Sequence, residues 1–212
     1  MKRIVILISL LSLFSCEDKP VLLPQVDHTI LAEIEDHSPI YMFFKTEGKD
    51  TLVDVNRRNS ISSTNWVFNI DKRLPLRLVI PEVMKLQQKK REEKAHKNEA
   101  AQNYYSYADT IGKNMAFIPF TEVYYKMEKP KTGLIVFFNK NNEISVNNVA
   151  VKKEELINYL NTLGIDKQSK TTLWFDKNMK YGSYIQNKIF IRSLNFSKSE
   201  LTPVIFNEEY VY

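Results

Sequence analysis

The segment that decides the fold is "GLIVFFNKNNEISVNN", at residues 133–148. An apolar run that ends in two phenylalanines is followed by a polar turn and by a second run in which apolar and polar residues alternate. Alternation with a period of two is typical of a half-buried strand, and a short polar stretch between two such runs is typical of a hairpin. The sequence therefore predicts a β-hairpin here.

The same pattern occurs earlier in the chain. Residues 40–56, "IYMFFKTEGKDTLVDVN", also lead through a strand that ends in Phe-Phe and a polar turn to an alternating strand. After each hairpin come an apolar strand, an Asp-Lys turn and a helical pattern, at residues 66–86 and 172–194. Self-similarity of this kind indicates that one structural unit is repeated. We therefore expect an α+β fold of two related halves, with mixed sheets and packed helices.

The spacing between the two copies points to an insertion. Equivalent phenylalanines, Phe43 and Phe137, are 94 residues apart, whereas the equivalent aspartates, Asp71 and Asp176, are 105 residues apart. A helix predicted at 151–163 in the second copy accounts for this difference, because the first copy has only a polar loop at that point. The apolar face of this helix is expected to consist of Leu156, Ile157, Leu160 and Leu163.

Further elements follow from the same rules. Aromatic and β-branched residues predict strands at 115–120, 121–127 and 202–206. A second helix is predicted at 181–194, because apolar residues recur there at helical spacing. These residues are Tyr184, Ile185, Ile189 and Leu194.

A long polar segment separates the two halves. Pro81 suits a first helical turn, and residues 87–103 are mostly polar around the whole helical wheel. Residues 81–108 therefore predict a solvated helix of about 25 residues, about 40 Å long. Two roles are open for it, a connector between the halves and a charged arm that binds a partner. The tyrosines of "NYYSYAD", at residues 103–109, are expected to seat its end on the domain.

The N-terminus has the layout of a secretory signal, with two basic residues before a short apolar run at 4–14. This run is too short to cross a membrane. Residues 13–16, "LFSC", resemble the lipobox of bacterial lipoproteins, which implies that residues 1–15 are cut away and that Cys16 is acylated, for example with palmitate. The alternative is a free core thiol. A disulfide within the chain is excluded, since Cys16 is the only cysteine.

Acylation of Cys16 would make the protein a permanently membrane-anchored one, because two or three acyl chains bind a bilayer far more strongly than one. The acids in "CEDK" resemble signals that route lipoproteins to the outer membrane. We therefore expect a lipid-anchored protein of the cell envelope, in the outer membrane and facing the periplasm or the surface. The expected organisation is a signal peptide at 1–15, a lipidated tether at 16–26, a first half at 27–80, a connecting helix and strands at 81–132, and a second half at 133–212.

The second copy resembles a known family, the periplasmic domain of the biopolymer-transport proteins ExbD and TolR. The resemblance covers residues 133–206 and, more faintly, 39–90. It consists of strand, short turn, strand, helix, strand, and then a turn of the form Asp-Lys/Arg, three residues, Tyr-Gly/Ser that leads into a second helix. The residues at these motif turns are Asp176, Lys177, Tyr181 and Gly182 in the second copy and Asp71 and Lys72 in the first.

The resemblance implies a fold and a mode of action, and no active site. Members of that family couple an ion-motive force to outer-membrane processes as stator or coupling subunits, and they dimerise through their periplasmic part. They carry a transmembrane helix with a proton-handling aspartate, whereas the only apolar segment here contains no acid. What the resemblance lets us expect is therefore binding, through strand-edge pairing, dimerisation or contact with peptidoglycan.

Nothing in the sequence predicts catalysis, a metal or a cofactor. The three histidines, His28, His37 and His96, are scattered, and no motif of a nucleophile, zinc protease or phosphate loop occurs. Asp71 and Asp176 could form an acid/base pair across a pseudo-twofold axis. The expected role of these aspartates is instead to form turns and to cap the helices that follow.

The net charge does not indicate a nucleic-acid partner. The formal charge is +5, and without the two basic residues at 2–3 it falls to +3, from 28 basic and 25 acidic residues. The expected function is that of a non-enzymatic envelope lipoprotein that binds envelope proteins or itself, as an accessory to a biopolymer-transport or stator-type complex. The alternative is a peptidoglycan-binding module. An open sheet edge would favour the first function, and a concave polar groove the second.

Overall fold

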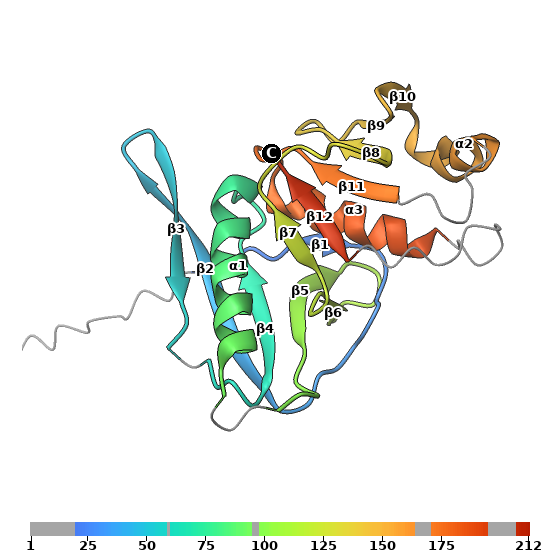
Figure 1. Cartoon of the computed structure of the whole chain (residues 1–212). Helices are drawn as coiled ribbons and strands as arrows, with labels where there is room; N and C mark the ends of the chain where they lie inside the picture. Colours follow the sequence, from blue (N-terminus) through green and yellow to red (C-terminus); the bar gives the residue numbers. More distant parts are fainter. Residues whose placement is uncertain (1–19, 59, 95–97, 164–170, 195–206) are drawn as a thin grey trace, which may run out of the picture.

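The computed structural model describes residues 20–58, 60–94, 98–163, 171–194 and 207–212. In these residues the chain forms two six-stranded mixed sheets and three α-helices (Figure 1). The predicted α+β class is confirmed at this level. Apolar residues of both sheets and all three helices join in one continuous core.

The first sheet contains a hairpin and a set of parallel strands. Its strands are β1 (Gln25–Val26), β2 (His37–Glu47), β3 (Asp50–Asn56), β4 (Asn65–Ile70), β5 (Asn103–Asp109) and β6 (Met115–Pro119). Their order is β1-β5-β4-β2-β3, and β6 pairs antiparallel with β5. Helix α1 (Leu76–Glu92) connects β4 to the parallel strand β5.

The second sheet is built from the rest of the chain. Its strands are β7 (Tyr124–Lys126), β8 (Leu134–Phe138), β9 (Ile144–Val146), β10 (Val149–Val151), β11 (Thr171–Phe175) and β12 (Glu208–Val211). Their order is β10-β9-β8-β11-β12-β7. The short 3-10 helix η1 (Lys153–Glu155) and helix α2 (Leu156–Thr162) follow β10, and helix α3 (Tyr181–Ser193) follows β11.

The two sheets share one strand order. The run β1-β5-β4-β2-β3 corresponds to β7-β12-β11-β8-β9, and in each run three parallel pairings are followed by one antiparallel pairing. Helices α1 and α3 occupy equivalent places, since each follows the third strand of its run in the chain. Parallel neighbours need such a crossover, because a tight turn can join only antiparallel strands. Strand β6 in one sheet, and β10 with α2 in the other, have no counterpart.

Tight turns at left-handed residues set the register of the hairpins. In the first sheet, Gly48 has a φ of +59° in the two-residue loop between Glu47 and Asp50. In the second, Asn147 and Asn148 have φ values of +47° and +69° in the loop between β9 and β10. Glycine and asparagine tolerate this region, and two-residue hairpin loops require it. The hairpin predicted from residues 133–148 is therefore present as β8 and β9, and β10 extends it.

Aromatic rings join the two halves of the core. Tyr105 of β5 stacks on Phe120 with ring centroids 3.7 Å apart, and it meets Tyr181 and Tyr184 of α3 edge-on at 5.7 and 6.3 Å. Such geometries are favourable beyond the area that the rings bury. Because these rings come from both sheets' elements, the halves pack as one body around them.

The prediction of a long polar helix at 81–108 is wrong. Helix α1 starts five residues earlier, at Leu76, and ends at Glu92, so Pro81 lies inside it. Its apolar face, which includes Val79 and Val83, is fully buried. An interior proline costs about 3 kcal/mol, but burial of an amphipathic face outweighs local propensity. The segment "NYYSYAD" is instead the inner strand β5, in which Tyr105 and Tyr107 share one face and are fully buried, whereas Tyr104 lies on the other face and is partly buried.

Other predictions are corrected in detail. The predicted helix 151–163 begins instead as β10 and η1, and only Leu156–Thr162 is α-helical. The predicted strand 202–206 lies outside the described residues, and β12 was not predicted. The tether predicted at 16–26 does not extend to its end, since the Leu22 carbonyl accepts the Lys72 amide at 2.7 Å and β1 pairs with β5.

Candidate interaction site

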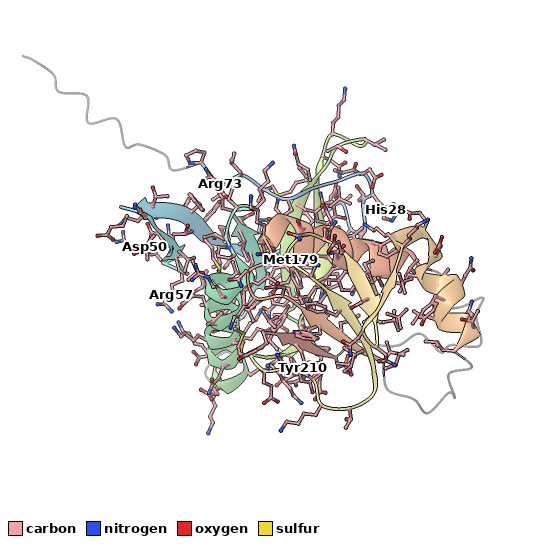
Figure 2. All side chains as sticks on the ribbon, turned by 90° about the horizontal axis from the view of Figure 1, so that it is seen from above. His28, Asp50, Arg57, Arg73, Met179 and Tyr210 are labelled. Atoms are coloured by element: carbon pink, nitrogen blue, oxygen red, sulfur yellow. The ribbon has the colours of Figure 1, made fainter. Side chains whose placement is uncertain are left out.

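The two Asp-Lys turns predicted from the sequence meet between the two sheets. The Leu76 amide donates to the Met179 carbonyl at 2.9 Å, and the Tyr181 amide donates to the Leu74 carbonyl at 2.8 Å. Figure 2 places Met179 near the centre of the molecule. The two bonds run in opposite directions between equivalent positions, so the turns are related by a local pseudo-twofold axis.

A second pair of bonds repeats this relation one residue further along each helix. The Arg77 amide donates to the Lys177 carbonyl at 2.7 Å, and the Gly182 amide donates to the Lys72 carbonyl at 3.0 Å. At Gly182 the approach is close, because a Cβ atom there would lie 3.1 Å from Cβ of Lys72. The four bonds together form a short antiparallel bridge between the halves.

These bonds supply the helix starts with acceptors. The N-caps of α1 and α3 are Pro75 and Lys180, and neither makes a side-chain capping bond. The first N–H groups of a helix have no partner within it. Here the carbonyls of the opposite turn accept them, so each helix start depends on the other half. The prediction that Asp71 and Asp176 cap the helices is therefore wrong.

The aspartates do form the turns, as predicted. Oδ1 of Asp71 accepts the amide of Arg73 at 3.0 Å, and Oδ1 of Asp176 accepts the amide of Asn178 at 2.8 Å. An aspartate that accepts the amide two residues ahead closes an Asx-turn, which mimics a backbone turn. Both positions thus do the same local work in the two halves.

Asp71 is held in its ionised form. Burial by itself would raise the pKa of this carboxyl, but hydrogen bonds from Arg73 and from the Leu22 amide hold its pKa below the usual value. The Arg73 guanidinium binds both oxygens, at 2.9 and 2.7 Å. Asp176 has a different partner, the Lys140 amide at 3.3 Å. The two carboxylates are bound to separate groups, which does not support their use as an acid/base pair.

The side chains of the two motif lysines also have structural partners. Nζ of Lys72 donates to Oε1 of Gln25 at 3.3 Å, which links the turn to β1. Nζ of Lys177 lies 4.3 Å from the ring centroid of Tyr212 at the C-terminus. Tyr181 is fully buried, and its hydroxyl has no hydrogen-bond partner among the described residues.

A buried network of hydrogen-bonded side chains, which the sequence did not reveal, lies beside the turns. The hydroxyls of Tyr105 and Tyr125 are 2.7 Å apart, and those of Tyr125 and Tyr184 are 3.1 Å apart. Tyr184 then donates to Oε2 of Glu209 at 2.6 Å, and Lys188 donates to Oε1 of the same carboxylate. These residues come from β5, β7, α3 and β12, so the network of hydrogen bonds extends from one half to the other.

The two ionisable groups of opposite sign in this network, Lys188 and Glu209, form a buried ion pair. Burial lowers the pKa of Lys188, and the neighbouring Glu209 carboxylate opposes that shift. Burial raises the pKa of Tyr184, and Glu209 raises it further. Tyr184 and Lys188 thus both donate hydrogen bonds to the side chain of Glu209. The only sequence signal was the spacing of Tyr184 and Lys188, four residues apart on one helix face.

A groove of about 700 Å³ lies between β1 and α3. It is formed by both halves of the chain. Its floor is apolar, and its walls carry amide, hydroxyl, imidazole, ammonium and carboxylate groups. The lining residues are Gln25, Val26, Asp27, His28, Thr110, Lys153, Gln186, Ile189, Phe190 and Ser193.

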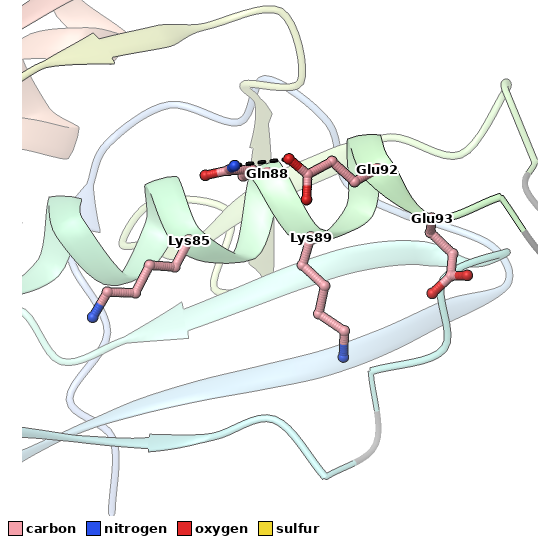
Figure 3. Close-up of a pocket in the computed structure, with 5 residues that line it drawn as sticks. All are labelled: Lys85, Gln88, Lys89, Glu92 and Glu93. Atoms are coloured by element: carbon pink, nitrogen blue, oxygen red, sulfur yellow. Dashed lines mark hydrogen bonds between the residues drawn. The ribbon is translucent and has the colours of Figure 1, made fainter.

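A second depression, of about 420 Å³, lies along the exposed face of α1. Figure 3 shows that its charged side chains extend from one helix, and Gln88 donates to Oε1 of Glu92 at 2.7 Å. All its lining residues belong to α1 or follow it directly. A polar helix face of this kind is ordinarily solvated, so we assign it no ligand.

Among the described residues, the strands at both ends of each sheet have a free edge, which is true of β1 and β7 as well as of β3 and β10. Strand β3 pairs with β2 alone, and β10 pairs with β9 alone. Asp50, at the start of β3, lies at the outer end of the hairpin in Figure 2. Val149 of β10 is half exposed. An unpaired edge can accept a further strand.

The remaining candidate residues are the cysteine and the three histidines. Cys16 and His96 lie outside the described residues. Nδ1 of His37 lies 3.1 Å from the Ile34 carbonyl, and His28 lines the groove between β1 and α3. In the described ranges, no group of three or more His, Cys, Asp or Glu side chains could hold a metal ion. None of the described helices combines the length and the apolar character needed to cross a bilayer.

In comparisons with models of protein families, with curated proteins and with solved structures, the chain matches none of them.

Proposed function

We propose that this chain is a cell-envelope lipoprotein, anchored through Cys16, that acts by protein–protein interaction. Its partner would be a biopolymer-transport or stator-type complex of the envelope. The observation that supports this proposal best is the strand order that the two sheets share, because it is consistent with two copies of one structural unit.

The junction between the halves supports a duplicated unit. The turn that carries the resemblance, Asp176–Gly182, binds the equivalent turn of the first half through reciprocal backbone bonds. Proteins of the ExbD and TolR family, which residues 133–206 resemble, dimerise through their periplasmic part. We infer that two copies of an ExbD/TolR-like unit, fused in one chain, pair internally here. Surfaces remote from the junction then remain for partners.

Partner binding would use the free edge of β10. In an antiparallel ladder alternate residues bond to the neighbouring strand, and Val146 and Val149 close the loop between β9 and β10. The N–H and C=O groups of Ala150 therefore point away from β9. An extended segment of a partner protein could add to this edge by main-chain hydrogen bonds.

A proline at position 150 tests this proposal. Ala150→Pro removes the outward N–H without removing a ladder bond, since proline is tolerated on an edge strand. Ala150→Val is the matched control, because it keeps the donor and suits a strand. Crosslinking and purification from intact membranes should recover partners with the wild type and with Ala150→Val, and fewer with Ala150→Pro. Equal recovery with all three would refute docking at β10.

One observation favours the alternative function, a peptidoglycan-binding module. The groove between β1 and α3 is concave and has polar walls, as expected for a site that binds a polar polymer. Sedimentation with isolated cell-wall sacculi tests this function. Protein in the pellet would support it, and protein that stays in the supernatant would exclude it.

A further inference from the structure

The groove between β1 and α3 contains a cation, Lys153, that forms no salt bridge with the described residues. Lys153 lies in η1 and reaches the groove, where its Nζ is 4.5 Å from the ring centroid of Phe190. In the described part of the chain, the side chain of Lys153 makes no hydrogen bond and no salt bridge. Its neighbour Lys152 differs, because it pairs with Glu155 at 3.7 Å and its side chain is 78% exposed.

The environment of Lys153 is costly for an unpaired ammonium. Burial lowers the pKa of Lys153, and the charges of Glu154 and Asp27 oppose this shift only in part. A desolvated charge is stabilised by a counter-ion that shares its site. The ring of Phe190 supplies part of this stabilisation through its π-face. An anion in the groove would supply the rest.

The other groups that line the groove indicate which chemical groups the anion should have besides its charge. Val26 and Phe190 are partly buried against the core, and Ile189 is almost fully buried, so the floor is apolar. Several polar groups are already engaged, since Gln186 donates to the Gln25 carbonyl at 3.0 Å. Among the described residues that line the groove, the basic ones are thus Lys153 and His28, and the acidic one is Asp27.

We propose that this groove binds a carboxylate attached to a small apolar body, with the carboxylate on Lys153 and the apolar body on Ile189 and Phe190. A volume of about 700 Å³ lies within the range of small-molecule sites. The carboxylate can belong to a short aliphatic acid or to the C-terminus of a peptide. The site is composite, because β1 belongs to the first half and Lys153 and α3 belong to the second. It does not depend on docking at β10.

The test is calorimetric titration of the full chain, purified in detergent, with three soluble probes. N-acetyl-leucine carries the carboxylate, an apolar body and a peptide-like amide; isovalerate lacks the amide, and N-acetyl-leucinamide lacks the carboxylate. We expect N-acetyl-leucine to bind at least about 10-fold more tightly than N-acetyl-leucinamide. Binding of isovalerate as tight as that of N-acetyl-leucine would identify an aliphatic acid, and weaker binding a peptide terminus.

Two charge-matched variants locate the site. Lys153→Gln should weaken binding of N-acetyl-leucine by about 10-fold or more, whereas Lys152→Gln should leave it unchanged. Lys153→Arg keeps the charge and should retain binding. The proposal is wrong if N-acetyl-leucine does not bind, if the amide binds equally well, or if Lys152→Gln weakens binding as much as Lys153→Gln.

Discussion

Replacing Glu209 alone should destabilise the protein far more than replacing it together with Lys188. The Glu209 carboxylate is 1% exposed and accepts hydrogen bonds from Lys188 and from Tyr184. Glu209→Leu leaves the ammonium in the core without a counter-ion. Removing one partner of a buried ion pair costs about 3–5 kcal/mol. For a chain of this size, that corresponds to a fall in melting temperature of about 6–20 °C.

The double variant separates the cost of an orphaned charge from the cost of lost packing. With Lys188→Met and Glu209→Leu combined, both charges are replaced by apolar groups, a change that is often neutral or stabilising. The Tyr184 hydroxyl keeps Tyr125 as a partner at 3.1 Å. We therefore expect the double variant to cost less than about 2 kcal/mol.

Urea unfolding with linear extrapolation measures these free energies. Glu155→Leu is the control, because Glu155 forms an exposed pair with Lys152 and its loss should have little effect. The reasoning is refuted if Glu209→Leu lies within about 1 kcal/mol of the wild type. It is also refuted if the double variant loses as much stability as the two single variants combined.

Three further predictions test other parts of the molecule. Gly182→Ala should destabilise the protein by about 1 kcal/mol in urea unfolding, because the added Cβ would crowd Lys72. Arg77→Ala, at the equivalent position of the first half, should not destabilise it; a Gly182→Ala protein more stable than the wild type would contradict the prediction. Burial lowers the pKa of Lys90 to about 8 from 10.5, so the unfolded state binds more protons between these values and stability should rise from pH 8 to pH 10.5. Lys90→Met should remove this rise, and an unchanged slope between pH 7.5 and 9.5 would contradict it. Cys16→Ser should move the protein from the membrane fraction to the soluble fraction, and wild-type protein that is already soluble would exclude the lipid anchor.

The predicted strands and the observed ones agree where a side-chain pattern is local. Residues 40–56 and 133–148 alternate over a short distance, and both form the predicted hairpins. The prediction failed at 81–108. There the run of lysines and glutamates was interpreted as one long helix, although the amphipathic helix ends at Glu92, and the tyrosines were interpreted as the end of that helix, although they form a strand. Lys90 shows the reason. It is buried and donates to three oxygen atoms, of Thr64, Gln102 and Asn103, which are too far from it in the sequence to belong to the same local pattern.

The sequence by itself determined the α+β class, the two hairpins and the positions of the Asp-Lys turns, because each depends on a pattern of residues close in the chain. Only the tertiary structure decided that the two turns bind each other, that Glu209 and Lys188 form a buried pair, and that Lys153 faces a groove made by both halves. These features join residues distant in sequence. Their energies depend on burial and on the direction of single N–H, C=O and charged groups, which a linear pattern of apolar and polar residues does not encode.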